Sequence, residues 1–372
     1  MKKYEISKFQ FFTIVCTYIF ANDMIRGLYV HDIKQDVWIA ISIGIIGSII
    51  VFLLYSFLIK NNNYADLKTS IENIVGNFFA KIIFIFYILY LSVLIFFHLF
   101  DLIQLIFIFF FPDFYIFILA IPILLVLIYT VSKGIEPFVR YGQVMFISAL
   151  ILFIVFSSFL FLFNDFDILN FLPILESGFK PIILPSLMMT YSVPMGELFV
   201  LLFFVQFVKD KNKSFKSGYF AILLSGTMLL TFTLFNIIFL NPESMKYGLT
   251  PSMRVFRKID TNNFIQRYDL INLSFIISFC IIKFSVFLFT SKEFFNYTFK
   301  PKKQNFIIFA ISGLVFIAIF IFQKQYIIIY NFRTKFFIPY INFVFEIIIP
   351  FILVFLSFFK RRKRQDKLEF EI

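Results

Sequence analysis

Long apolar runs joined by short polar links make up most of the chain. A helix needs roughly 17–25 mainly apolar residues to cross the hydrocarbon core of a membrane. The chain offers ten such runs, with approximate cores at residues 9–29, 37–59, 82–111, 114–131, 141–163, 182–208, 218–240, 264–290, 304–322 and 339–359. The pattern predicts an all-α integral membrane protein with about ten transmembrane helices.

Composition supports the same class. Hydrophobic residues make up 60% of the chain, 63 residues are Phe, and the mean hydropathy is +0.91, well outside the range of soluble domains. The longest polar link, residues 241–262, is too short for an independent domain, so we expect one membrane domain over 1–359 and no enzyme. Cys16 and Cys280 fall inside predicted spans, where thiols usually act as small apolar fillers, and we expect no metal or cofactor.

The distribution of positive charge predicts the orientation. With an even number of spans both termini lie on one side, and segments on that side hold 22 of the 34 Lys and Arg, against 11 on the other side. Both termini are therefore expected to be cytoplasmic, with a basic tail at 360–372 beside anionic head groups. The net charge of +12 then needs no nucleic-acid partner. Lys2 and Lys3 also resemble the start of a signal peptide, but no small-x-small cleavage site follows.

The sixth run, which contains TYSVPMGELFVLLFF at residues 190–204, carries a predicted helix break. Pro194 removes a hydrogen-bond donor, and Gly196 tolerates a turn that other residues resist. Glu197 places a carboxylate at membrane depth, where an ionisable group costs about 2.5–3.5 kcal/mol on insertion scales and is a functional candidate by default. A proline kink that only shapes packing is the simpler alternative.

The first run has a comparable interruption in FANDMIRG at residues 20–27. Interrupted first and sixth spans are typical of 5+5 inverted-repeat transporters, in which both breaks face a binding site at the midplane. Repeat one would cover 9–163 and repeat two 182–359. Free N–H groups there can hold a carboxylate while carbonyls and an acid receive an ammonium, which suits a zwitterionic amino acid. Alternatively, Asp23 and Arg26 simply neutralise each other near the outer surface.

Other polar residues lie within the predicted spans. His98, Asp101 and Gln104 recur every three residues, forming a stripe that suits either a proton relay and pocket wall or an interhelical hydrogen-bond network. Lys283 is isolated at mid-span, so it should have an acidic partner or act in place of an ion. Glu346 is a weaker candidate, because it lies toward the outer end of the last run, within reach of the interface.

Several segments, taken in order, resemble the B subunit family of bacterial spore germinant receptors, within the amino acid, polyamine and organocation transporter superfamily. The segments are ISKFQFF (6–12), KGIEPFVRYGQ (133–143), FDILNFLPILESGFKPIILPS (166–186), PMGELFVLLFF (194–204), IQRYDLI (265–271) and FCIIKFS (279–285). Each is short and apolar, but their order and spacing over nearly the whole chain make the likeness specific.

The resemblance implies a LeuT-type fold in the inner membrane of the spore, a small nutrient ligand such as an amino acid, and partner A and C subunits, the latter a lipoprotein. It matches Gly196 and Glu197 to the family's proline-glycine-glutamate element, Arg267 and Asp269 to its Arg-x-Asp element, and Lys283 to its eighth-helix lysine. The first break departs from the glycine-rich family pattern, since Met24, Ile25 and Arg26 precede a single Gly27. That bulk is expected to reshape the pocket, to alter the ligand, or to leave a subunit that no longer senses one.

Two functional classes fit these features: a receptor subunit that senses a nutrient, and an amino acid permease coupled to a cation. A mainly structural subunit is a third. The candidate ligand-binding residues are Asn22, Asp23, Met24, Gly27, His98, Asp101, Tyr191, Ser192, Pro194, Gly196 and Glu197, with Lys283 and Arg26 in an ion-like or coupling role.

Overall fold

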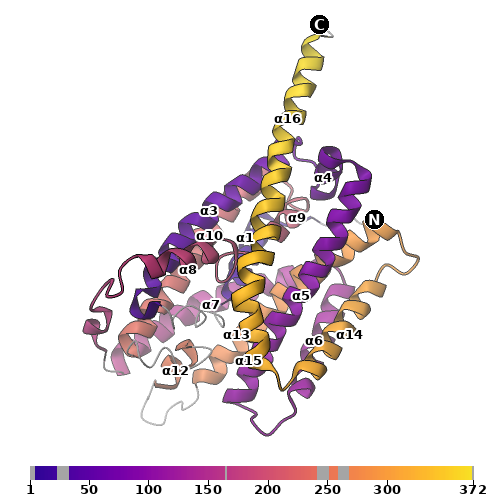
Figure 1. Cartoon of the computed structure of the whole chain (residues 1–372). Coiled ribbons are helices and arrows are strands. Elements are labelled where there is room, and N and C mark those ends of the chain that lie inside the picture. Colours follow the sequence, from indigo (N-terminus) through magenta and orange to yellow (C-terminus); the bar gives the residue numbers. More distant parts are fainter. Residues whose placement is uncertain (1–4, 23–32, 164–165, 241–250, 259–267, 371–372) are drawn as a thin grey trace.

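The chain folds into helices joined by short links. The computed structural model describes residues 5–22, 33–163, 166–240, 251–258 and 268–370 (Figure 1). Within these ranges there is no β-strand, and extended pairing is limited to an isolated bridge between Ile6 and Val208. The fold is therefore all-helical over the described residues.

The helical segments range from single turns to long spans. In chain order they are α1 (Lys8–Phe20), η2 (Lys34–Asp36), α3 (Val37–Asn61), α4 (Leu67–Val75), α5 (Asn77–Phe109), α6 (Ile116–Ser132), α7 (Glu136–Phe163), η3 (Ile168–Phe171), α8 (Lys180–Tyr191), η4 (Phe199–Leu201), α9 (Leu202–Val205), α10 (Lys211–Phe239), α12 (Pro251–Lys258), α13 (Tyr268–Phe299), α14 (Phe306–Phe322), α15 (Tyr326–Phe332), the π-helical segments η5 (Arg333–Asn342) and η6 (Val344–Ile348), and α16 (Ile349–Phe370).

Among the described residues, six stretches of helix are long and apolar enough to cross a membrane. They are Lys34–Asn61, Asn77–Phe109, Glu136–Leu162, Lys211–Phe239, Tyr268–Phe299 and Tyr326–Lys360. The apolar helices α1, α6 and α14 are shorter, and α8 with α9 occupies the predicted sixth run. The last of the long helices begins at Tyr326, well before the predicted start near residue 339. This early start changes the depth of the polar residues that the helix carries.

Helix α13 is at the centre of the packing. In its most apolar window 78% of residues are buried, against 17% for α7, so α13 is surrounded by protein while α7 has a largely exposed apolar surface. Helix α13 packs along α5, α1 and α7, and α3 packs along α8 and α10. A residue on the inner face of α13 is therefore enclosed by several helices, which is where a polar side chain can find partners instead of lipid.

Small residues allow α3 and α8 to approach closely. A Cβ added at Gly47 would lie 2.3 Å from the Thr190 hydroxyl oxygen, and one at Gly44 would lie 2.9 Å from the Met189 Cβ. Contact through glycines is how membrane helices gain dispersion energy when lipid offers no hydrophobic driving force. The close approach places the end of α8, and hence the sixth-run break, firmly against α3.

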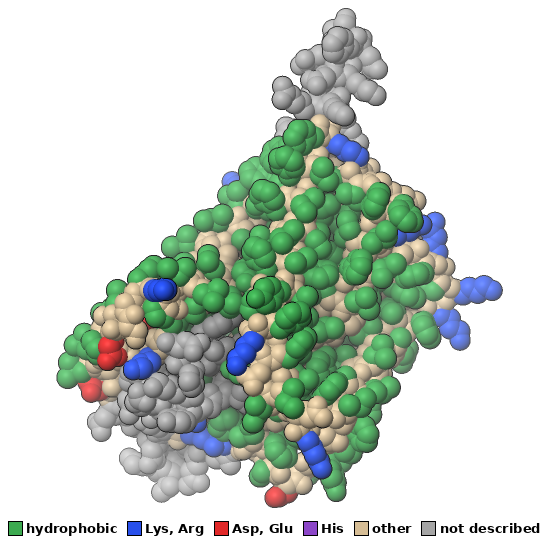
Figure 2. All heavy atoms as spheres, in the orientation of Figure 1, with side chains coloured by type: hydrophobic (Ala, Val, Ile, Leu, Met, Phe, Trp, Pro, Cys, Tyr) green, Lys and Arg blue, Asp and Glu red, His purple; other side chains and the backbone are tan. Residues whose placement is uncertain are grey.

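Figures 1 and 2 show how the molecule is arranged along its long direction. Helices α4 and α9 lie at the end from which α16 projects, and α12 and the turn between α14 and α15 lie at the opposite end (Figure 1). Hydrophobic side chains cover most of the visible flank, and charged side chains are few and lie mainly toward its margins (Figure 2). An apolar flank between charged margins is the surface of an integral membrane protein.

Candidate functional site at the interrupted helix

The sixth run is interrupted between α8 and α9. Helix α8 ends at Tyr191, and helical backbone resumes at Phe199. The turn folds back so tightly that a Cβ added at Gly196 would lie 1.9 Å from the Tyr191 carbonyl carbon. The Gly196 N–H donates to the Ser192 carbonyl at 2.5 Å. Only glycine fits this position, so the local sequence accounts for the interruption at the place where the pattern predicts one.

Glu197 has an unusual backbone conformation. Its φ is +62°, a left-handed value that residues other than glycine and asparagine seldom adopt. Residues held in this conformation cluster at functional sites. The Tyr18 hydroxyl of α1 donates to the Glu197 carbonyl at 2.7 Å, and the Glu197 N–H donates to the Tyr191 carbonyl at 3.2 Å. These bonds hold the conformation and direct the carboxylate toward the protein interior, where it is 1% exposed.

Lys283 supplies the countercharge. Its Nζ lies 2.6 Å from Glu197 Oε2, and both side chains are 1% exposed. The same ammonium donates to Asn22 Oδ1 at 2.5 Å and lies 5.0 Å from the centre of the Tyr18 ring. A buried charge is tolerated only when it is paired and hydrogen-bonded, and this lysine meets both conditions. Glu197 is therefore the acidic partner that the isolated lysine required.

Asn22 joins the end of α1 to the interrupted sixth run. Its Nδ2 donates to the Pro194 carbonyl at 2.8 Å, while its Oδ1 receives the lysine. Helix α1 ends at Phe20, so Asn22 lies just past its last turn. The backbone carbonyl that the break leaves without a helical partner is satisfied by this amide, as an interruption at membrane depth requires.

His98 connects this ion pair to a second one. Its Nε2 lies 3.1 and 3.2 Å from the two Glu197 carboxylate oxygens, and its Nδ1 lies 3.5 Å from Arg333 Nη2. A guanidinium can only donate, so Nδ1 is the acceptor and Nε2 carries the hydrogen that Glu197 accepts. Arg333 forms an ion pair with Asp101, to which the Tyr326 hydroxyl also donates at 3.3 Å. A polar network thus runs from Lys283 on α13 through Glu197 and the neutral His98 to Arg333 on η5 and Asp101 on α5.

The structure brings together some of the predicted site residues. Asn22, His98, Pro194 and Glu197 meet around Lys283. Ser192 accepts a hydrogen bond from Asn342, and Tyr191 packs on Phe343 with ring centres 5.4 Å apart, so both lie beside the cluster. Asp101 is one ion pair away from it. The predicted residues Asp23, Met24, Arg26 and Gly27, like Arg267, lie outside the described residues.

The three residues of the predicted stripe on α5 have different surroundings in the structure. His98 and Asp101 belong to the charge network, whereas the Gln104 side-chain nitrogen is buried with no hydrogen-bond partner among the described residues. Asp269 lies elsewhere, with its carboxylate 2.8 Å from Arg257 Nε of α12. Cys16 and Cys280 are buried and unpaired, as expected of apolar fillers.

Sequence reasoning was wrong about Glu346. The sequence places it toward the outer end of the last run, within reach of the interface, but its side chain is 2% exposed. The reason is that the helix begins at Tyr326, which places residue 346 near the middle of a long span. Its carboxyl oxygens lie 3.2 Å from the Tyr55 hydroxyl oxygen, 3.2 Å from the Tyr90 hydroxyl oxygen and 3.1 Å from the Phe199 backbone nitrogen. The sequence signal that could have indicated a buried Glu346 was the presence of two hydroxyl-bearing residues, Tyr55 and Tyr90, inside apolar runs.

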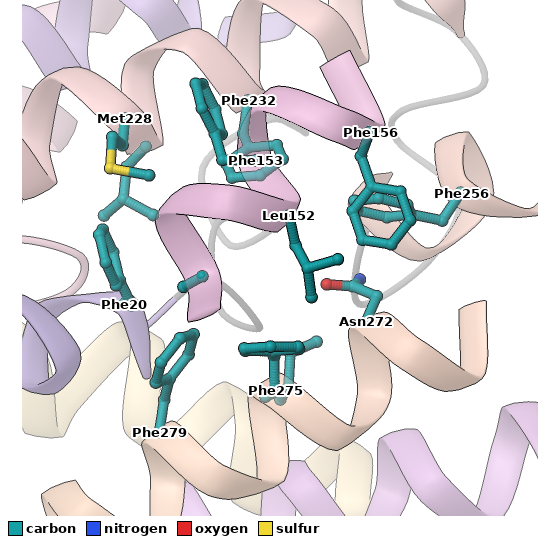
Figure 3. Close-up of a pocket in the computed structure, with 13 residues that line it drawn as sticks. Phe20, Leu152, Phe153, Phe156, Met228, Phe232, Phe256, Asn272, Phe275 and Phe279 are labelled. Atoms are coloured by element: carbon teal, nitrogen blue, oxygen red, sulfur yellow. The ribbon is translucent and has the colours of Figure 1, made fainter. Parts of the chain in front are cut away.

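The structure also contains an aromatic pocket whose lining includes no residue of the charge cluster. Figure 3 shows the side chains that line it. It is lined by Phe20, Ala149, Leu152, Phe153, Phe156, Met228, Leu229, Phe232, Phe256, Asn272, Phe275, Ile276 and Phe279. None of the predicted site residues is among them. It touches the site region only at its edge, where Phe20 at the end of α1 meets Phe279 with ring centres 5.5 Å apart. A largely apolar lining offers little to a charged ligand.

Fold and site together define the class: an integral membrane protein whose interrupted helix encloses a buried ion pair. Residues 5–328 match the model of the spore permease family, described as "Spore germination protein". The chain is also 22% identical over 335 residues to "Spore germination protein KB" of Bacillus subtilis (strain 168), and the match covers 89% of each chain. The chain therefore belongs to the spore germination protein family, the germinant receptor B subunits that its sequence resembles.

Proposed function

We propose that this chain is the transporter-like membrane subunit of a spore germinant receptor. It binds a small nutrient, in the first instance an amino acid, at the interruption between α8 and α9. It passes the signal to the A subunit and the C lipoprotein of the receptor. Family membership supports the receptor role, and the buried pair of Glu197 and Lys283 is the observation that carries the nutrient site.

The proposed architecture is a LeuT-type 5+5 inverted repeat of about ten spans, with α1 and the pair α8 and α9 as the discontinuous first helices of each half. The hydrogen bond from Asn22 to the Pro194 carbonyl supports it, because the end of one interrupted segment contacts the other. The protein would lie in the inner membrane of the spore with both termini on the core side, in keeping with the excess of Lys and Arg there.

The charge arrangement favours a zwitterion over a singly charged ligand. An amino acid that enters the cluster presents its carboxylate to Lys283 and its ammonium to Glu197. The two protein charges separate, yet each remains paired, so no buried charge is left without a partner. A lone anion or cation would strand one of the two protein charges. The site thus exchanges one internal ion pair for two intermolecular ones.

Such an exchange supplies the differential affinity that a receptor needs. A ligand shifts a conformational equilibrium only as far as it binds the two states unequally. The side chains of Tyr18 and Asn22, at the end of α1, donate to the backbone carbonyls of Glu197 and Pro194 in the interrupted sixth run. Drawing the carboxylate away from Lys283 therefore acts on the half-helices themselves, and the changed break is the signal that partner subunits read.

Spores that carry Glu197→Gln test the nutrient site. We expect the receptor to assemble at normal levels while germination with single amino acids falls at least about tenfold, because one charge-assisted bond in a buried site is worth about 1.5–3 kcal/mol. Immunoblotting of spore membranes measures assembly, and loss of refractility measures germination. A normal response at every nutrient concentration would refute the site.

Liposome flux separates the receptor from the cation-coupled permease. The purified chain without its partners is reconstituted and supplied with radiolabelled amino acids. We expect no uptake above that of empty liposomes. Uptake driven by an imposed ion gradient would instead assign the same site to transport.

A further inference from the structure

The last long helix contacts the interrupted run on both sides of the break between α8 and α9. Asn342 Nδ2 donates to the Ser192 hydroxyl at 2.9 Å, just before the turn. Four residues later, Glu346 accepts the Phe199 N–H at 3.1 Å, just after the turn. Both residues belong to the π-helical segments η5 and η6, a geometry that is frequent at functional sites. One helix therefore holds both sides of the break.

Glu346 differs from the other carboxylates of this polar core. Glu197 has Lys283 at ion-pair distance, and Asp101 has Arg333. Over the residues that the structure describes, no Lys, Arg or His nitrogen lies within ion-pair distance of Glu346. Its side chain is nonetheless 2% exposed. An ionised carboxylate so placed would be a buried charge without a countercharge, which is strongly disfavoured unless the group takes up a proton.

The hydrogen-bond pattern around Glu346 accommodates that proton. The Tyr55 hydroxyl contacts two acceptors, the backbone carbonyl of Glu346 and its Oε2, the latter at 3.2 Å. One hydroxyl has one hydrogen, so it can serve the carbonyl while Oε2 donates a hydrogen of its own back to Tyr55. Tyr90 then donates to Oε1 at 3.2 Å, and the Phe199 N–H donates to Oε2. Every polar atom of a neutral acid is satisfied.

The titratable groups that surround Glu346 supply no positive charge. Tyr87, like Tyr55 and Tyr90, is a neutral phenol, and its hydroxyl donates to the Phe345 carbonyl. The field of Glu197 also reaches Glu346, and it is negative. On α4, which packs against α16, Lys68 pairs with Glu293, and Glu72 accepts the Tyr297 hydroxyl. These groups come from α3, α5, α4, α13 and the interrupted segment, and each of them either is neutral, is negative or is engaged elsewhere.

We propose that Glu346 is a proton-binding site that is occupied while the break has this geometry. When Phe199 withdraws and water reaches the carboxyl, the O–H bond of Oε2 breaks, the electron pair stays on the oxygen, and the proton passes to water. The reverse step reseals the break. Proton occupancy of Glu346 and the position of the second half-helix are thus linked, and each must favour the other. The inference rests on the proposed function only in that the same break responds to nutrient.

Infrared spectroscopy of the purified full chain tests the site directly. A protonated carboxyl gives a carbonyl stretching band that is separate from the carboxylate bands. We expect the wild type at neutral pH to show a buried band of this kind that is absent in Glu346→Gln. The matched control is Glu197→Gln, whose parent acid is paired with Lys283, and it should leave the band in place. A wild type without the band, or a band that persists in Glu346→Gln, would overturn the proposal.

A second variant guards against misfolding of Glu346→Gln. Tyr90→Phe removes the hydrogen bond to Oε1 but keeps the ring and the acid. The band should remain and move to higher frequency, because a carbonyl that loses a donor absorbs higher. An unmoved band would assign it to another group. The measurement requires no nutrient, so its outcome is independent of whether the interrupted helix binds one.

Discussion

Glu197 belongs to the interrupted helix and Glu346 contacts it from the last long helix; both are buried, yet they have opposite surroundings. Glu197 contacts Lys283 and His98, so its environment favours the charged form. Glu346 contacts two phenols and a backbone N–H and has no described cation at ion-pair distance, so its environment favours the neutral form. Burial alone therefore does not define what a carboxylate in a membrane protein does.

The contrast also separates two tasks. A paired charge that a zwitterion can share is suited to ligand recognition, whereas a neutral acid that bonds to the second half-helix is suited to reporting its position. Glu197 lies on the interrupted segment itself, whereas Glu346 reaches that segment from η6 of the last long helix. The comparison is tested by substitutions at Gly196, which forms the tight turn, at Lys283, which is the cation, and at Glu346, which is the neutral acid.

Gly196→Ala should have the largest effect, because its Cβ would lie within 2.3 Å of three backbone atoms of Tyr191 and Ser192. Backbone cannot yield as a flexible side chain can, so the cost should exceed the roughly 1–3 kcal/mol of ordinary overpacking. We expect little folded protein, measured by size-exclusion chromatography in detergent. The matched control is Gly313→Ala on α14, where an added Cβ meets nothing within 4 Å and should be harmless. Equal yields of the two variants would contradict the close backbone approach at Gly196.

Lys283→Met makes Glu197 resemble Glu346 by removing its cation. Breaking a buried ion pair from one side typically costs about 3–5 kcal/mol, because the remaining charge is left unpaired. We expect a large drop in the thermal unfolding midpoint in detergent, with much of it recovered in the double variant Lys283→Met with Glu197→Gln. A double variant less stable than Lys283→Met alone would show that the pair does not interact as described.

Replacement of Glu346 by glutamine should cost less stability than truncation of its side chain to alanine. Glu346→Gln keeps acceptor and donor atoms in a group of the same size, so a loss of about 1 kcal/mol or less is expected. Glu346→Ala strands the Phe199 N–H and the Tyr90 hydroxyl, and each buried unsatisfied group costs about 1–3 kcal/mol. Unfolding midpoints rank the two variants. If the glutamine were as damaging as the alanine, the acid would have to be charged in the folded protein.

Arg140→Ala should cause the smallest loss of stability among these variants. Its side chain is 74% exposed and pairs with Glu136 at 3.6 Å. Exposed ion pairs contribute about 0–1 kcal/mol, so the unfolding midpoint should barely change. A loss comparable to that of Lys283→Met would mean that burial does not govern the value of ion pairs in this protein.

The class of protein and the sixth-run break could be predicted because both are local. Apolar length defines a span, and Pro194 and Gly196, two residues apart, together favour a break at that point of the run. The partner of Lys283 could not be predicted, because it depends on which helices enclose α13. The burial of Glu346 could not be predicted because the last run was expected to begin near residue 339, whereas the helix begins at Tyr326 and includes Arg333, which pairs with Asp101.

The nutrient site is tested most directly by thermal-shift binding on the purified full chain, with a panel of the protein-forming amino acids as probes. The account predicts that at least one amino acid raises the unfolding midpoint of the wild type, and that the same amino acid has no effect on the folded double variant Lys283→Met with Glu197→Gln. An undiminished shift in the double variant, or a wild type that no amino acid stabilises, would contradict it.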